Sequence, residues 1–246
     1  MDFLNGNIKP MYFKYLSAAF GSAMISSIYS IVDTAMGILT VLFNRQIMQY
    51  LGASALAIYG PIIQVSTFVQ CCAYSVGQAS QPIISTNFGA GKGERIKETL
   101  RLALWTTGFF GVFWTVLSMA FPNAYIRIFM TPTPEILNMA PAIVRTYALS
   151  FLLLPFNIFS TYYFQAILKP KAAFVVSVAR GLVISGILIL TLPVLVRADT
   201  IWFAMPVTEL LVMVYAALTM RTCTKALPQG PACMDAPSCN AAENLI

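Results

Sequence analysis

The chain has 246 residues, of which 58% are hydrophobic and 10% are charged, and its mean hydropathy is +0.75. Soluble domains carry about 25% charged residues, so this composition excludes an ordinary water-soluble protein. The formal net charge is +6, but the basic residues stand between apolar runs, which argues against nucleic acid as a partner. The chain has no histidine, and the usual zinc ligand sets therefore cannot form easily. We expect no metal site, no catalytic residues and no cofactor.

Six apolar runs follow one another, each near the roughly 20 residues that a helix needs to cross a bilayer. They cover residues 16–43, 55–85, 102–121, 139–168, 172–196 and 200–220. We therefore predict an all-α polytopic membrane protein, with a helical bundle of about six transmembrane helices in residues 1–220. Residues 221–246 are rich in proline and contain few large apolar residues, so they are predicted to form a disordered tail.

The basic residues of the connections predict the orientation. Alternate connections, counted from the N-terminus, contain most of them: Lys9, Lys14, Lys92, Arg95, Lys97, Arg101, Lys169, Lys171, Arg221 and Lys225. The other connections contain Arg45, Arg127 and Arg197. Because positively charged loops remain in the cytoplasm, we predict a multi-pass protein of the plasma membrane with both termini in the cytoplasm.

The first run contains the first candidate site. Residues 16–43 would extend about 42 Å as one helix, against a hydrocarbon core of about 30 Å, so we expect a single tilted or kinked helix. Asp33 lies well inside it, with Ser26, Tyr29 and Ser30 on the same helical face. An ionisable group in hydrocarbon is costly and is a functional candidate. Asp33 is therefore a candidate site for H⁺ or Na⁺, and the alternative is an aspartate at a helix end that reaches the interface.

The second and fourth runs carry polar stripes at helical spacing. In the second run Gln70, Tyr74 and Gln78 form the middle of a stripe, and in the fourth Asn157 and Thr161 stand beside several aromatic residues. Polar groups in hydrocarbon must find partners or line a wet cavity, and aromatic rings bind lipophilic cations well. We take these five residues as candidates for a substrate cavity, and interhelical hydrogen bonds or core packing remain the alternative.

Two further ionisable residues lie deep in the last two runs. Arg180 is the obvious partner of Glu209, because two opposite charges are removed from water at less cost when they meet. We predict a structural ion pair between them. A role of Glu209 in ion coupling is the alternative.

Several motifs resemble one known family. Gln81-Pro82, followed by Asn87-Phe88-Gly89-Ala90-Gly91, resembles the loop after the eighth helix of multidrug and toxic compound extrusion (MATE) transporters. Residues 1–36, which end in Ile31-Val32-Asp33-Thr34-Ala35-Met36, resemble the start and the first helix of that family. From Gly37 onward the chain resembles the seventh helix, with Val41-Leu42-Phe43-Asn44-Arg45-Gln46, and residues 37–220 continue to the twelfth.

The resemblance implies a fold and a function. The family has twelve helices in two related bundles, so the chain resembles the first helix joined to the second bundle, one half of such a transporter. The implied function is a cation-coupled antiporter, driven by Na⁺ or H⁺, that exports lipophilic organic cations or drugs, here as an incomplete version. Asp33 matches the coupling carboxylate of the family's first helix, and Glu209 belongs to a matching Pro-x-x-Glu motif.

Two alternatives stay open. One is a flippase for lipid-linked glycans, since the same superfamily contains such proteins. The other is a truncated half that does not transport and binds a second copy or a partner half. The expected partners are membrane lipid and a small organic cation.

Overall fold

The structure is a computed structural model, and it describes residues 37–227. The described part of the chain is built of helices and contains no strand, as the all-α prediction requires. Asp33, the rest of residues 1–36 and most of the predicted tail lie outside the described residues.

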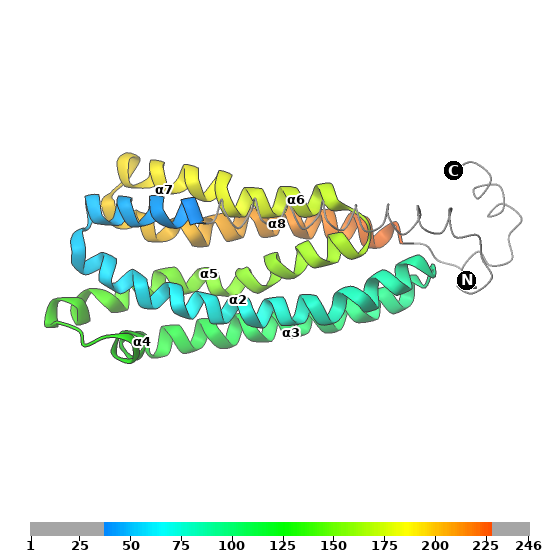
Figure 1. Cartoon of the computed structure of the whole chain (residues 1–246), viewed down its shortest axis with the longest axis horizontal. Coiled ribbons are helices and arrows are strands. Elements are labelled where there is room, and N and C mark those ends of the chain that lie inside the picture. Colours follow the sequence, from blue (N-terminus) through cyan, green and yellow to red (C-terminus); the bar gives the residue numbers. More distant parts are fainter. Residues whose placement is uncertain (1–36, 228–246) are drawn as a thin grey trace, which may run out of the picture.

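The helices follow in an order that Figure 1 shows from blue to red. Residues 37–50 are helical and are followed by α2 (Gly52–Gly89), α3 (Gly93–Ala120), α4 (Pro122–Phe129), α5 (Pro134–Ala166), α6 (Pro170–Val178), the π-helical turn η1 (Ala179–Val183), α7 (Ile184–Leu195), the 3₁₀ turn η2 (Ala198–Phe203) and α8 (Ala204–Lys225). Among the described residues, five helices are long and apolar enough to cross a membrane: α2, α3, α5, the continuous α6–η1–α7 and η2–α8. With the helix that ends at residue 50, they match the predicted set of about six.

The boundaries at the two ends of the bundle differ from the prediction. The first helix continues beyond residue 43 to residue 50, because Phe43 and Ile47 are buried and the Phe43 ring packs 4.7 Å from the Tyr59 ring, between centroids. The last helix continues beyond residue 220 to Lys225. Thr224 Oγ1 lies 2.7 Å from the Tyr163 hydroxyl, which ties this end to α5. The predicted tail of residues 221–246 therefore begins too early.

Helix α5 is the centre of the bundle. It packs against α2, α3, α6 and α8, and four of its large side chains are fully buried: Leu154, Phe159, Tyr163 and Phe164. Buried apolar surface of this kind is the main stabilising term in packing. The aromatic residues of α5 that the sequence offers for binding organic cations are therefore mostly core residues.

Opposite ends of the bundle differ in charge. The α2–α3 turn, the α5–α6 connection and the end of α8 lie together, at the right in Figure 1. The segments that meet there contain Lys92, Arg95, Lys97, Arg101, Lys169, Lys171, Arg221 and Lys225. The segments at the opposite end, which are the end of the helix of residues 37–50, α4 and the α7–η2 connection, contain Arg45, Arg127 and Arg197. We call the end at the α2–α3 turn the basic end. Arg145, which the sequence places within a span, donates from Nε to the Met119 carbonyl near the end of α3, at 3.3 Å.

The predicted orientation leads to a labelling experiment. In a variant without native cysteines, single cysteines at Lys92, Lys171 and Arg197, all exposed positions, are treated in intact cells with a reagent that cannot cross the membrane. Because the basic end is expected to face the cytoplasm, only position 197 should be labelled. After permeabilisation all three positions should react. Labelling of position 92 or 171 from outside would show that the orientation is wrong.

Candidate functional site

Three polar side chains from three helices meet in the interior of the bundle. Arg180 in η1 donates from Nε to Glu209 Oε1 in α8, at 2.7 Å. Asn157 in α5 donates from Nδ2 to Glu209 Oε2 at 2.6 Å and to the Glu209 carbonyl at 2.8 Å. Asn157 and Glu209 are 0% exposed, and Arg180 is 9% exposed. Both carboxylate oxygens are thus satisfied, which is the condition for keeping a buried ion pair stable.

A π-helical turn positions the arginine. Residues Ala179–Val183 have the wider turn, with hydrogen bonds from each residue to the fifth one along. In such a turn, residues five apart lie on the same face, and Ser185 Oγ donates to the Arg180 carbonyl. Arg180, Gly181 and Ser185 are all buried as a result. Single π turns within α-helices often occur at functional sites, which supports a functional interpretation of Arg180.

The arginine also lines a cavity. This cavity has a volume of about 220 Å³ and lies between the helix of residues 37–50, α2, α5, η1, α7 and α8. Its polar lining includes Ser66, Thr67, Gln70, Tyr147 and Arg180. Arg180 is the charged residue of this lining. Glu209 is fully buried outside the lining, and its carboxylate neutralises the charge of Arg180. The cavity therefore has a mixed lining of polar and apolar side chains, and the charge of Arg180 in it is balanced.

The structure divides the predicted cavity residues into separate groups. Gln70 lines the cavity, and its amide nitrogen lies 3.4 Å from Ser66 Oγ, to which it donates. Asn157 is not part of the lining and binds Glu209 instead. Thr161 donates to the Ile158 carbonyl at 2.7 Å, within its own helix. The half-buried Tyr74 packs edge-on against Tyr162, with ring centroids 6.4 Å apart.

The remaining end of the α2 stripe joins helices. Gln78 is exposed and is not among the residues that line the cavity at Arg180. Gln81 Nε2 donates to Gln165 Oε1 on α5, at 3.3 Å. Within this stripe, Gln70 therefore lines a cavity, and Gln81 forms an interhelical hydrogen bond.

Tyr147 and Ser66 were missed by sequence reasoning. Both residues line the cavity. Ser66 precedes Gln70 by one helical turn, so the α2 stripe could have included it. Tyr147 has the apolar Ile143 and Val144 one helical turn before it, and the small Ser150 one turn after it donates to the Tyr147 carbonyl at 2.7 Å. This pattern did not mark Tyr147 as a member of a polar stripe.

Solved structures with the same fold are transporters. A multidrug resistance MATE family transporter of the MOP superfamily in an outward-facing conformation has a TM-score of 0.73 and 16% identity, over 81% of this chain and 45% of that one. A second structure, a MOP superfamily transporter from Pyrococcus furiosus with a binding pocket described as having reverse polarity, has a TM-score of 0.71 and 15% identity, over 82% and 46% of the two chains. At these identities the likeness shows the fold. The chain spans less than half of either protein.

Comparison of the sequence with known proteins identifies one similar protein and one matching family model. The Probable multidrug resistance protein YoeA of Bacillus subtilis is 29% identical over 84 residues, which cover 34% of this chain and 18% of that protein. The MatE family model matches residues 18–190. Since this match extends over more than half of the chain and the fold agrees with it, the protein belongs to the MatE family.

Proposed function

We propose that the protein is a cation-coupled antiporter component that exports lipophilic organic cations or drugs, with Na⁺ or H⁺ as the coupling ion. The observation that carries this proposal is the buried carboxylate of Glu209, held by Arg180 and Asn157 beside a cavity with polar and apolar lining residues. An ionisable cluster inside a membrane bundle is a functional candidate by default. The family and the multidrug relatives support a role in efflux.

The ion pair gives a physical reason for exchange at this cavity. While Glu209 is ionised it neutralises Arg180, and the cavity tolerates an organic cation. A proton on Glu209 would remove that balance and leave the positive Arg180 at the cavity wall, which repels a cation. Bound proton and bound drug would then exclude each other, as antiport requires. Asp33, outside the described residues, is proposed as the main coupling carboxylate, with Glu209 as the second.

An exposed polar residue on α2 indicates that another bundle lies against this face of the helix. Gln78 is exposed on α2, and a polar amide that faces hydrocarbon is costly. Alternating access needs two bundles that move against each other around a site between them. We infer that the chain works against an opposing bundle, supplied by a second copy in parallel orientation or by a partner half.

The flippase alternative requires a cavity that attracts a phosphate-linked substrate. The positively charged side chain in the described lining is that of Arg180, and Glu209 already balances its charge. This arrangement favours a cationic or neutral lipophilic substrate over an anionic one.

A vesicle assay tests the proposal. The full chain is reconstituted into lipid vesicles. The vesicles are loaded with a fluorescent lipophilic cation, and an inward gradient of H⁺ or Na⁺ is applied across their membrane. Efflux should follow one of the two gradients, and Asp33→Asn should abolish it while the variant stays folded, because the amide keeps the shape but cannot bind and release a proton. Asp199→Asn, at a side chain 75% exposed, is the matched control and should retain efflux.

Two results would count against the proposal. Ion-driven efflux at the wild-type rate in Asp33→Asn would remove Asp33 as the coupling site. No efflux in either gradient from a well-folded, dimeric wild-type protein would favour the half that only binds a partner. Native mass spectrometry of the same preparation gives the oligomeric state.

A further inference from the structure

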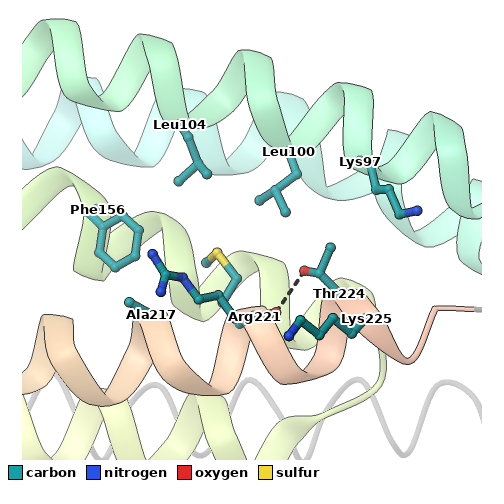
Figure 2. Close-up of a pocket in the computed structure, with 9 residues that line it drawn as sticks. Lys97, Leu100, Leu104, Phe156, Ala217, Arg221, Thr224 and Lys225 are labelled. Carbon is teal, nitrogen blue, oxygen red and sulfur yellow. Dashed lines mark hydrogen bonds between the residues drawn. The ribbon is translucent and has the colours of Figure 1, made fainter.

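A second hollow lies at the basic end, away from the Arg180 cavity. It has a volume of about 550 Å³ and lies between α3, α5 and α8. Its deeper wall is apolar and consists of Leu100, Leu104, Phe156, Ala217 and Met220. We call it the α3–α8 groove, and Figure 2 shows it from the side.

The outer part of the groove is basic. Lys97 from α3 and Arg221 and Lys225 from α8 line it, and in Figure 2 their side chains come from the two facing helices. Lys97 binds Glu94 at 2.7 Å. Within residues 37–227, neither Arg221 nor Lys225 forms an ion pair, and no carboxylate lines the groove. Two exposed cations thus remain without a counter-charge from the described part of the chain.

The order of these residues along the helices is informative. On α3, Leu104 lies about 10 Å deeper than Lys97, and on α8, Ala217 lies about 12 Å deeper than Lys225, at 1.5 Å per residue. Lys97 lies near the beginning of α3, and Lys225 ends α8. The apolar wall therefore faces the membrane interior, and Lys97 and Lys225 lie where spans of this length reach the lipid headgroups. Arg221 lies at the same end of α8, and in Figure 2 its guanidinium group points inward along the groove, beside Phe156 and Ala217.

We propose that the α3–α8 groove binds an anionic phospholipid, with an acyl chain along the apolar wall and the phosphate group at Arg221 and Lys225. The guanidinium group of Arg221 can bind two phosphate oxygens at once, and Lys225 adds a point charge. Basic pockets between transmembrane helices are suited to anionic headgroups. The positive charge of the groove disfavours binding of an organic cation, and its apolar wall offers no partner to free phosphate. An anionic lipid matches both the basic residues and the apolar wall. The site is independent of the transport cavity and of any coupling ion.

Native mass spectrometry tests this with the full chain in detergent and equal amounts of phosphatidylglycerol and phosphatidylcholine. The wild type should retain phosphatidylglycerol preferentially. Because each cation near an anionic lipid surface contributes about a fivefold preference, Arg221→Gln with Lys225→Gln should reduce the preference on the order of twentyfold. Arg221→Lys keeps the charge and should keep most of the preference. Arg197→Gln, an exposed arginine at the opposite end, is the control and should behave as wild type.

A second pair of variants tests the apolar wall. Ala217→Phe fills the groove and should reduce retention of the lipid, whereas Leu218→Phe, at a 60% exposed position on the same helix and outside the groove, should not. Free phosphate should not displace the lipid. Equal retention of the two lipids by the wild type, an unchanged preference in the double variant, or wild-type retention by Ala217→Phe would each overturn the proposal. Because these readouts do not involve efflux, they are distinct from the failure of the proposed function.

Discussion

Replacing Glu209 by alanine is expected to destabilise the protein by roughly 3–5 kcal/mol, the usual effect of removing one partner of a buried ion pair. The variant leaves the guanidinium of Arg180 and the amide of Asn157 without their acceptor in an interior where Glu209 is 0% exposed. A buried cation without a counter-charge is far more costly than a lost surface contact. Thermal unfolding of the purified full chain in detergent, followed by tryptophan fluorescence, measures the loss.

Three controls separate charge from packing. Glu209→Gln keeps the shape and removes the charge, so its effect should be intermediate. Arg180→Met with Glu209→Met removes both charges and should recover most of the stability, because apolar residues often replace buried pairs without loss. Asp199→Ala breaks an exposed pair with Arg197 at 3.9 Å and should cost less than about 1 kcal/mol. A double variant no more stable than Glu209→Ala would show that the charge of Arg180 is not the cause.

The pairing of Arg180 with Glu209 was open to prediction because depth in the membrane limits the choice of partner. Both residues lie near the middle of their apolar runs, and a charge in hydrocarbon needs a counter-charge at the same depth. The approximate number of membrane-spanning helices follows equally directly from hydropathy, since length and apolar composition decide what crosses a bilayer. These features depend on the sequence of a single helix or on one pair of residues, so they can be predicted without knowing how the helices pack.

The role of Asn157 depends on three helices and was not predictable. Its spacing groups it with Thr161 and Gln165 on one face of α5, and periodicity assigns all three to one environment. In the structure Asn157 points to Glu209, Thr161 bonds back to its own helix, and Gln165 accepts from Gln81. The π turn at Arg180 has no comparable signal in the sequence either, because it depends on how α6–α7 packs against its neighbours.

Close packing between α3 and α5 sets a second strong constraint, at Gly111. A Cβ atom at this position would lie 2.6 Å from the Leu152 carbonyl oxygen and 3.4 Å from that of Phe151. Both are backbone atoms of the central helix, so they cannot move aside as a flexible side chain would. One helical turn further on, Thr115 Oγ1 donates to the Ala148 carbonyl across the same interface, at 3.4 Å. Small residues of this kind let membrane helices approach closely.

Gly111→Ala is therefore expected to destabilise the protein by about 1–3 kcal/mol, the usual range for overpacking a well-packed interior. Gly108, on the same helix, is the matched control: it is exposed, and a Cβ atom there would meet nothing within 4 Å. Gly108→Ala should leave stability unchanged or raise it by up to about 1 kcal/mol, because alanine has the higher helix propensity. Thermal unfolding of both variants in detergent gives the comparison. Equal stability of the two variants would mean that α3 and α5 are further apart at Gly111 than the structure shows, since helix propensity acts alike at both positions and only the contact with α5 distinguishes them.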